Sequence, residues 1–238
     1  MTRTPTIVLL GGSGLAPWAW ERVTEHLEGG GLRTRAPQLS ATGDDRTPAA
    51  EVSMQDWIDD VIDELRAQHT DRSVLVAHSF AGYVAAAVLE RAPMLVRTAI
   101  FLDAAIPSPR RSWFETMGPE TEAFMRSLAD NGAIPFFTRE QLDQVFPGHG
   151  ISDEAWAWMS AKITPQPLHT YTQPATMRDI DTEATTLAYV RCLRTSPPVA
   201  EIDETTPGWV YRSLPTGHWP MITDPLATAN MIGELATL

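Results

Sequence analysis

Short runs of apolar and β-branched residues alternate along this chain with longer stretches in which apolar residues recur every three or four positions. The first pattern predicts buried strands, and the second predicts helices that pack on a sheet. The alternation therefore predicts an α/β fold with a mostly parallel central sheet flanked by helices on both faces. We expect strands at Thr6–Leu10, Leu32–Arg35, Ser73–Ala77, Thr98–Leu102, Thr186–Leu193 and Trp209–Ser213, and helices at Trp18–Leu27, Met54–Arg66, Phe80–Arg91 and Asp224–Leu238.

The alternation stops between about residues 108 and 184, where no strong strand pattern occurs. This stretch is rich in aromatic residues, proline and glycine, and it contains helical patterns at Glu120–Ala129, Arg139–Val145 and Asp153–Ile163. We expect a core of residues 1–107 and 185–238 with a helical cap or lid inserted at 108–184. The alternative is a structural subdomain whose aromatic residues form its own core. A lid over a pocket needs apolar lining, and the expected lining residues are Trp113, Phe136, Phe137, Trp156 and Trp219.

Composition excludes several classes of protein. The chain has 238 residues, with 18 basic and 30 acidic side chains and a formal net charge of −12. An acidic chain lacks the basic face that nucleic acids and anionic membranes require. Lys162 is the only lysine, so a Schiff-base mechanism would have to use that residue, and the single cysteine, Cys192, cannot form an internal disulfide. No segment reaches the roughly 18 to 20 apolar residues of a membrane helix.

The start of the chain allows two interpretations. Arg3 precedes the apolar run Ile7–Leu10 and then small residues, somewhat as in a short signal peptide. We favour a buried strand that runs into a glycine turn, because that turn has a chemical role in the argument below. Cytoplasmic residence follows as the expectation.

A serine lies between an expected strand and an expected helix. The apolar strand Ser73–Ala77 leads through one residue to Ser79, and an apolar helix begins at Phe80. A serine on such a sharp turn exposes its hydroxyl, and the helix N-terminus favours developing negative charge. The spacing meets G-x-S-x-G only loosely, since Ala77 and Ala81 occupy the glycine positions. We interpret Ser79 as a nucleophile; a serine that only caps the helix is the alternative.

A glycine-rich turn, Gly-Gly-Ser-Gly at residues 11–14, follows the first strand. Attack on an ester carbonyl forms an oxyanion, and two backbone N–H groups directed at it supply much of the rate. We expect one N–H group from Phe80 and the other from Ser13, with Gly12 as a further donor. A phosphate-binding loop is disfavoured, because neither G-x-G-x-x-G nor the Walker spacing with lysine occurs.

His218 lies between the last expected strand and the last helix, at the edge of the sheet where a general base could reach Ser79. The other histidines fit this role less well. His26 and His69 are expected on outer helices, His78 is expected to point away from the serine, and His149 and His169 belong to the insertion. No histidine pair has metal-ligand spacing, so we expect no metal and no cofactor.

These three segments, in this order, resemble the α/β-hydrolase superfamily. Residues 11–20, 77–82 and 217–221 are similar to the branch that contains plant methylesterases, hydroxynitrile lyases and many bacterial esterase-like members. The resemblance implies that Ser79 is the nucleophile, that His218 is the base, and that Ser13 and Phe80 donate to the oxyanion beside an apolar pocket. Gly11 replaces the histidine of the family's His-Gly motif, which should weaken the support of this loop.

The triad acid has several candidates. The family usually carries it after the strand that ends near residue 192, where this chain has Thr195 and Ser196. A few α/β-hydrolases instead carry it after the strand that follows the nucleophile, where this chain has Asp103. We favour Asp103. The alternatives are Asp203, Glu204 and, less favoured, Glu201, or a neutral partner, Thr195 or Ser196, which would leave His218 a poorer base.

Four functions fit this sequence. The favoured one is a serine hydrolase that cleaves a small hydrophobic or aromatic ester, thioester or lactone. The second is a natural-product tailoring enzyme, such as a polyketide cyclase or decarboxylase, that forms no acyl-enzyme. A cyanohydrin lyase is disfavoured because Gly12 and Trp219 replace the threonine and lysine usual there, and a non-catalytic ligand binder is the fourth. The expected partner is a hydrophobic small molecule, and the oligomeric state stays open between a monomer and a homodimer.

Overall fold

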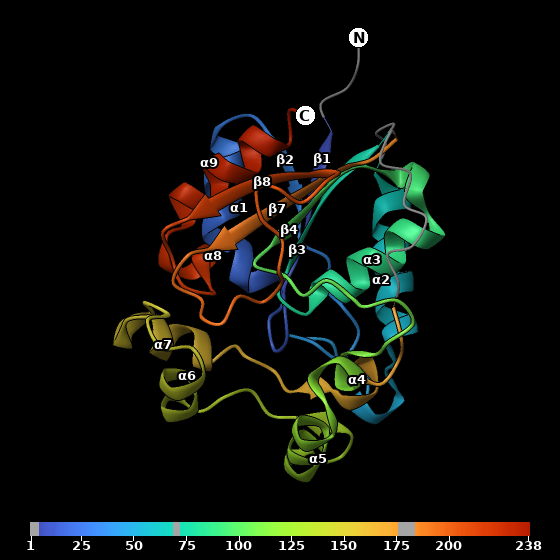
Figure 1. Ribbon diagram of the computed structural model, residues 1–238, viewed down its shortest axis with the longest axis vertical. Coiled ribbons are helices and arrows are strands. Elements are labelled where there is room, and N and C mark those ends of the chain that lie inside the picture. Colours follow the sequence, from blue (N-terminus) through green and yellow to red (C-terminus); the bar gives the residue numbers. More distant parts are fainter. Residues whose placement is uncertain (1–4, 69–71, 176–183) are drawn as a thin grey trace.

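The computed structural model describes residues 5–68, 72–175 and 184–238 (Figure 1). In this part of the chain, six parallel strands form one sheet in the order β2-β1-β3-β4-β7-β8. This confirms the predicted α/β architecture with a parallel central sheet. The strands are β1 (Thr6–Leu10), β2 (Arg33–Arg35), β3 (Ser73–His78), β4 (Val96–Leu102), β7 (Thr186–Cys192) and β8 (Trp209–Leu214).

Helices cover both faces of the sheet because alternate strand residues are apolar on both sides. Ile7 and Leu9 of β1 pack into one core cluster with α1 (Glu21–Gly29) and α9 (Pro225–Leu235), which lie against each other. Val8 and Leu10 face the opposite cluster with α2 (Met54–Ala67) and α3 (Ala81–Arg91). Helix α3 is apolar almost throughout, and the residues Ala81–Leu89 are buried. The sheet is therefore sandwiched between two helical layers, as Figure 1 shows.

The helix expected from Trp18 differs at its start, whereas the last helix starts as predicted, with Asp224 as its N-cap and Pro225 as its first residue. The helix expected at Trp18–Leu27 is a 3₁₀ turn, η1 (Pro17–Trp20), followed by α1, and both tryptophans of η1 are buried. The helix expected at Asp224–Leu238 begins at Pro225, where the Asp224 side chain accepts a hydrogen bond from the Ala227 N–H group. A short helix, α8 (Pro220–Thr223), precedes it, and further 3₁₀ turns are η2 (Ala49–Glu51) and η3 (Pro93–Leu95).

Most of the regular elements between β4 and β7 are helices, and Figure 1 shows these helices on the side of the molecule opposite the C-terminus. It contains α4 (Trp113–Met117), α5 (Pro119–Leu128), α6 (Arg139–Val145), α7 (Asp153–Ser160) and η4 (Leu168–Tyr171). A small antiparallel pair, β5 (Ala133–Ile134) and β6 (Gln166–Pro167), was not expected. Residues 176–183 of the predicted insertion lie outside the described residues, and its role as a lid stays a prediction.

Across the described ranges, no helix is long and apolar enough to cross a lipid bilayer.

Candidate functional site

Ser79 occupies the turn between β3 and α3. Its φ angle of +55° lies in the left-handed region, which is unfavourable for a residue with a side chain. Backbone hydrogen bonds hold it there: the Ser79 carbonyl accepts from Gly82 N–H (3.1 Å) and from Ala105 N–H (2.9 Å). The residue is half-buried, so its hydroxyl lies at the sheet edge with part of its surface accessible.

Two glycines allow the backbones around Ser79 to approach. A Cβ atom on Gly82 would lie 2.1 Å from the carbonyl oxygen of Ala105, and a Cβ atom on Gly12 would lie 2.6 Å from the Cβ atom of Ser79. The close packing expected at this turn therefore occurs at positions 82 and 12, while positions 77 and 81 accept alanine.

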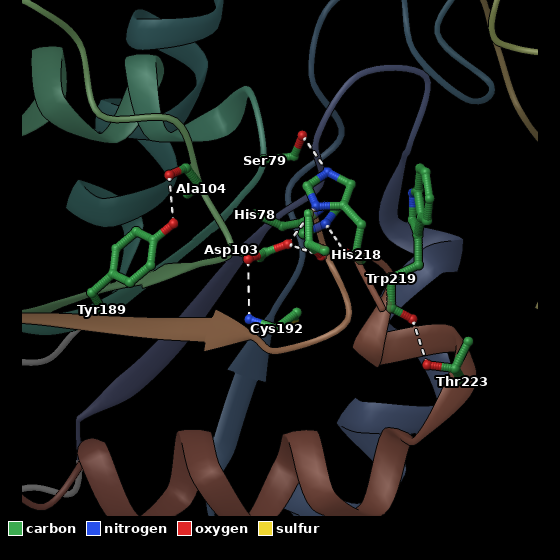
Figure 2. Close-up of polar contacts among 10 residues, drawn as sticks. His78, Ser79, Asp103, Ala104, Tyr189, Cys192, His218, Trp219 and Thr223 are labelled. Atoms are coloured by element: carbon green, nitrogen blue, oxygen red, sulfur yellow. Dashed lines mark hydrogen bonds and ion pairs between the residues drawn. The ribbon is translucent and has the colours of Figure 1, made fainter. Parts of the chain in front are cut away.

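His218 follows β8 and connects Ser79 to Asp103. Its Nε2 atom lies 2.9 Å from Ser79 Oγ, and its Nδ1 atom lies 2.7 Å from Asp103 Oδ2 (Figure 2). His218 is 3% exposed and Asp103 is 1% exposed. The three side chains form one hydrogen-bonded chain whose outer end, at Ser79, reaches accessible surface.

Asp103 lies directly after β4 and is held on both carboxylate oxygens. Oδ1 accepts from the Cys192 backbone N–H group (3.0 Å), and Oδ2 also accepts from the Thr195 hydroxyl (2.7 Å). Burial raises the pKa of Asp103, but the hydrogen bonds from His218, Thr195 and Cys192 outweigh it and leave this pKa below the ordinary value. Asp103 is therefore an ionised acceptor at neutral pH, and Thr195, at the usual acid position, donates to it.

The other acid candidates lie elsewhere. Asp203 accepts hydrogen bonds from Thr205 and Thr206 within its own exposed turn. Glu201, Glu204 and Ser196 are exposed. The structure thus places Asp103, of all the candidates, against His218; that it acts as the triad acid stays a prediction.

The glycine turn after β1 lies against the nucleophile turn. Among the described residues, no hydrogen-bond partner is assigned to the N–H group of Ser13 or of Phe80. An oxyanion site needs N–H groups that are not already paired within the protein, so these two groups meet that requirement. Gly12 lies close against the Ser79 turn, where an added Cβ atom would meet the Cβ atom of Ser79, and its role as a further donor stays a prediction.

Aromatic rings surround the site on two sides. On one side the Phe80 ring packs edge-on against Trp113, with a centroid distance of 6.5 Å. On the other side Trp219 lies 4.8 Å from the His218 ring and 6.2 Å from Phe136. Of the five expected pocket residues, Phe137 joins this second group through Phe136, whereas Trp156 lies under the guanidinium of Arg139.

Three residues without a predicted role lie at the site. Phe146 stacks on the His218 ring, with a centroid distance of 4.9 Å and an interplanar angle of 11°. Tyr171 donates a hydrogen bond from its hydroxyl to Ser13 Oγ (2.6 Å). His78, expected to point away from the serine, donates from Nε2 to the backbone carbonyl of His218 (2.7 Å). The sequence could not predict these contacts, because the partners lie far apart along the chain. The aromatic character of the insertion was the only signal for those of Phe146 and Tyr171.

His78 is a neutral residue beneath the site. It is 1% exposed, and burial and the nearby His218 lower the pKa of His78 to about 3. Its Nδ1 atom has no hydrogen-bond partner in the described structure. The imidazole is therefore a neutral donor that ties the end of β3 to the His218 loop.

Among the described residues, no contact joins the remaining histidines to Ser79. His26 and His169 are exposed, whereas His149 is buried, pairs with Asp143 (2.8 Å) and accepts the Ile151 N–H group (2.9 Å). His69 lies outside the described residues. Within the described ranges, no group of three or more histidine, cysteine, aspartate or glutamate side chains is placed to hold a metal ion.

Comparisons with known proteins agree on one family. The model of the alpha/beta hydrolase family matches residues 7–231. A carbendazim hydrolyzing esterase from Nocardioides sp. (strain SG-4G) is 24% identical over 239 residues, which cover 96% of this chain and 98% of that protein. The probable esterase PIR7A from Oryza sativa subsp. indica is 34% identical over 123 residues, or 51% of this chain and 45% of that protein. The putative chloroplastic methylesterase 12 from Arabidopsis thaliana is 24% identical over 251 residues, covering 97% of this chain and 71% of that protein.

Solved structures share the fold. An extracellular alpha/beta-hydrolase from a Paenibacillus species has a TM-score of 0.82 at 18% identity, over 97% of this chain and 98% of that one. A pyrethroid hydrolase from Sphingobium faniae JZ-2 has a TM-score of 0.75 at 24% identity, over 98% of this chain and 97% of that one.

Proposed function

The chain belongs to the alpha/beta hydrolase family, and from this premise we propose that it is a serine hydrolase that cleaves a small hydrophobic or aromatic ester through an acyl-enzyme on Ser79. The enzyme class, a carboxylic ester hydrolase of the α/β-hydrolase type, agrees with the esterases among its relatives. The observation that carries the proposal is the hydrogen-bonded chain from Asp103 through His218 to the accessible hydroxyl of Ser79.

In the proposed acylation step, the Ser79 oxygen attacks the ester carbonyl while His218 Nε2 takes the hydroxyl proton. His218 then carries a positive charge, which the ionised Asp103 stabilises through Nδ1–H. The same proton passes from Nε2 to the departing alkoxide, and the alcohol leaves. Water then attacks the acyl-enzyme, with His218 again as the base, and releases the acid and the free serine.

The oxyanion of each tetrahedral intermediate would be held by the N–H groups of Ser13 and Phe80, with the N–H group of Gly12 as a further donor. These donors are backbone groups in short turns anchored to the sheet, so they need little rearrangement as charge develops. Gly11 removes the usual histidine of this loop without removing these N–H groups.

The substrate class follows from the surroundings of Ser79. Rings of Phe80, Trp113, Phe136 and Trp219 lie near the site and favour apolar or aromatic groups. We include thioesters and lactones, because they present the same carbonyl to the nucleophile. The relatives include a carbendazim hydrolyzing esterase and a putative methylesterase, which agrees with an ester as the substrate.

Other parts of the proposal rest on the sequence. Residues 108–184 would act as the cap over the site, the partner would be a hydrophobic small molecule, and the compartment would be cytoplasmic. The proposed function is compatible with either a monomer or a homodimer. A tailoring enzyme without an acyl-enzyme loses its main argument, the missing acid, because Asp103 lies beside His218.

Fluorophosphonate labelling tests the nucleophile. We expect a single adduct on Ser79 in mass mapping, together with hydrolysis of short aryl esters. Ser79→Ala should lose both, while Ser160→Ala, at an exposed serine of α7, should keep both. A folded protein that forms no Ser79 adduct and hydrolyses no aryl ester would overturn the proposal.

A further inference from the structure

The expected oxyanion loop is held by the insertion through three hydrogen bonds. Thr164 N–H donates to the Gly14 carbonyl (3.2 Å), Gly14 N–H donates to Gln166 Oε1 (3.4 Å), and the Tyr171 hydroxyl donates to Ser13 Oγ (2.6 Å). These partners come from one short segment, residues 164–171, which is about 150 residues further along the chain. The segment therefore acts on the loop as a clamp, and we call residues 164–171 the loop clamp.

The loop itself fixes one peptide group. Leu15 N–H donates to the Gly12 carbonyl (3.0 Å). In a trans peptide the carbonyl and the N–H group point in opposite directions, so this bond also orients the Ser13 N–H group. A one-turn loop rich in glycine is conformationally free, and side-chain or tertiary contacts have to hold the next peptide groups in place.

Tyr171 touches both residues expected to supply the oxyanion donors. Its hydroxyl binds the Ser13 side chain, and its ring lies edge-on against the Phe80 ring with a centroid distance of 4.6 Å. It is 3% exposed, and burial raises the pKa of its hydroxyl above the ordinary value, so Tyr171 is a neutral donor. Gln166 is equally buried, and its Nε2 donates to Thr170 Oγ1 (2.6 Å), which fixes Oε1 toward Gly14.

We propose that Tyr171, with Gln166, is a positioning residue that keeps the loop in the conformation in which the hydrogen bond from Leu15 to Gly12 directs the Ser13 N–H group, replacing the support lost where Gly11 stands. Neither side chain touches the reacting atoms. The inference rests on the proposed function and adds that the insertion, as well as the core, shapes the oxyanion site. Loosening the loop clamp should therefore weaken binding of the transition state more than binding of the substrate.

Tyr171→Phe tests this directly because it removes only the hydroxyl. We expect kcat for an aryl acetate to fall about tenfold to a hundredfold, less than the loss for deleting an oxyanion donor, with KM within about twofold. The inhibition constant of an aryl trifluoromethyl ketone, which forms an oxyanion on the serine, should rise by the same factor. Tyr83→Phe is the matched control, since Tyr83 is equally buried but donates to Thr116 Oγ1 (3.0 Å), away from the loop.

Ser13→Ala provides a second route, because it removes the acceptor of Tyr171 but keeps the backbone N–H group. It should reproduce the loss of Tyr171→Phe, and the double variant should lose no more, as expected of two groups in one contact. Should Tyr171→Phe fail to fold, Ser13→Ala with wild-type kcat overturns the inference. If the wild type is active and Tyr171→Phe matches Tyr83→Phe, the inference alone is overturned. If the wild type shows no hydrolysis and no Ser79 adduct, the proposed function falls, and the inference with it.

Discussion

Ser79 and Asp103 share an unusual backbone conformation at the ends of neighbouring strands. Their φ angles are +55° and +43°, and such conformations cost about 1–3 kcal/mol each. Sheet hydrogen bonds hold both residues, since Ser79 N–H donates to the Leu102 carbonyl and Asp103 N–H donates to the Val190 carbonyl. The hydrogen bonds of the sheet thus stabilise these two strained conformations. In these conformations both side chains lie next to His218.

Asp103→Asn should reduce kcat for an aryl ester by about 10³ to 10⁴, with little change in structure. An amide cannot stabilise the charged His218 as a carboxylate does, and it favours the wrong tautomer of the ring. The measurement is kcat of the purified variant at neutral pH. Asp203→Asn, in the exposed turn, serves as the control and should keep full activity. A loss below tenfold for Asp103→Asn would remove this residue from the mechanism.

His78 should make the folded protein sensitive to mild acid. Its pKa is about 3 in the folded state against an ordinary value of 6.5, so below pH 6.5 the unfolded chain binds a proton that the folded chain does not. The contribution is complete above pH 6.5, and it falls by about 1.4 kcal/mol per pH unit toward pH 3. Asp103, also lowered in pKa, loses its contribution only below its ordinary value of 3.8.

Urea unfolding between about pH 6.5 and pH 4.5 tests the His78 contribution by comparing the wild type with a variant, because this range lies between the ordinary pKa values of histidine and aspartate. His78→Gln should be less stable at pH 7 but should lose less free energy of unfolding on acidification than the wild type. His26→Gln, at an exposed histidine, should keep the wild-type slope. An unchanged slope in His78→Gln would contradict the assignment.

Single residues can be predicted from the sequence where their place relative to a strand or helix decides their role. Ser79 and His218 follow from a strand end and a loop at the same sheet edge. The sequence favours Asp103 among the candidate acids but does not decide between them, because the decision depends on which carboxylate lies next to His218 in the folded protein. Tyr171 and Phe146 could not be given roles, since their contacts join residues more than 70 positions apart.

Two helical glycines show how the elements differ in their tolerance of side chains. Gly82 lies in the first turn of α3, where its missing Cβ atom leaves room for the Ala105 carbonyl. Gly233 lies in α9, where a Cβ atom would meet Leu32 at an ordinary 3.5 Å.

Gly82→Ala should lower the free energy of unfolding by about 3 kcal/mol, because the carbonyl belongs to rigid backbone. Gly233→Ala should raise it by about 0.5–1 kcal/mol, because alanine restricts the unfolded chain and fits the helix. Urea unfolding of both variants gives the comparison. Wild-type stability in Gly82→Ala would show that the backbones separate at that turn at little cost.

The elements that the sequence predicts best are those with a buried, periodic pattern. All six expected strands occur with bounds shifted by at most two residues at either end. The apolar runs of β1, β3, β4 and β7 lie in the sheet core. The pair β5 and β6 was missed, since two residues per strand carry no period. Pro17 explains the 3₁₀ start before α1, a local feature that the apolar spacing does not resolve.

The whole molecule carries a net charge of −12, from 30 acidic and 18 basic side chains. Such an excess produces self-repulsion that destabilises the compact state. Exposed ion pairs such as Arg66–Asp63 and Arg91–Asp59 offset little of it. Salt screens both the repulsion and the ion pairs. The direction in which Tm changes with salt therefore shows which of the two contributes more to stability.

We expect repulsion to dominate, so that Tm at pH 7.5 rises when NaCl is raised from about 0.01 M to 0.5 M, where the screening length falls from about 30 Å to a few ångströms. A gain of about 1 kcal/mol would raise Tm by about 2–4 °C in a chain of this length. The control is the same salt step near the isoelectric point of about 4.8, where the net charge is close to zero and Tm should not rise. His78 lowers the starting Tm there, but it acts equally at both salt concentrations. A fall in Tm at pH 7.5 would mean that the ion pairs contribute more to stability than the charge excess removes.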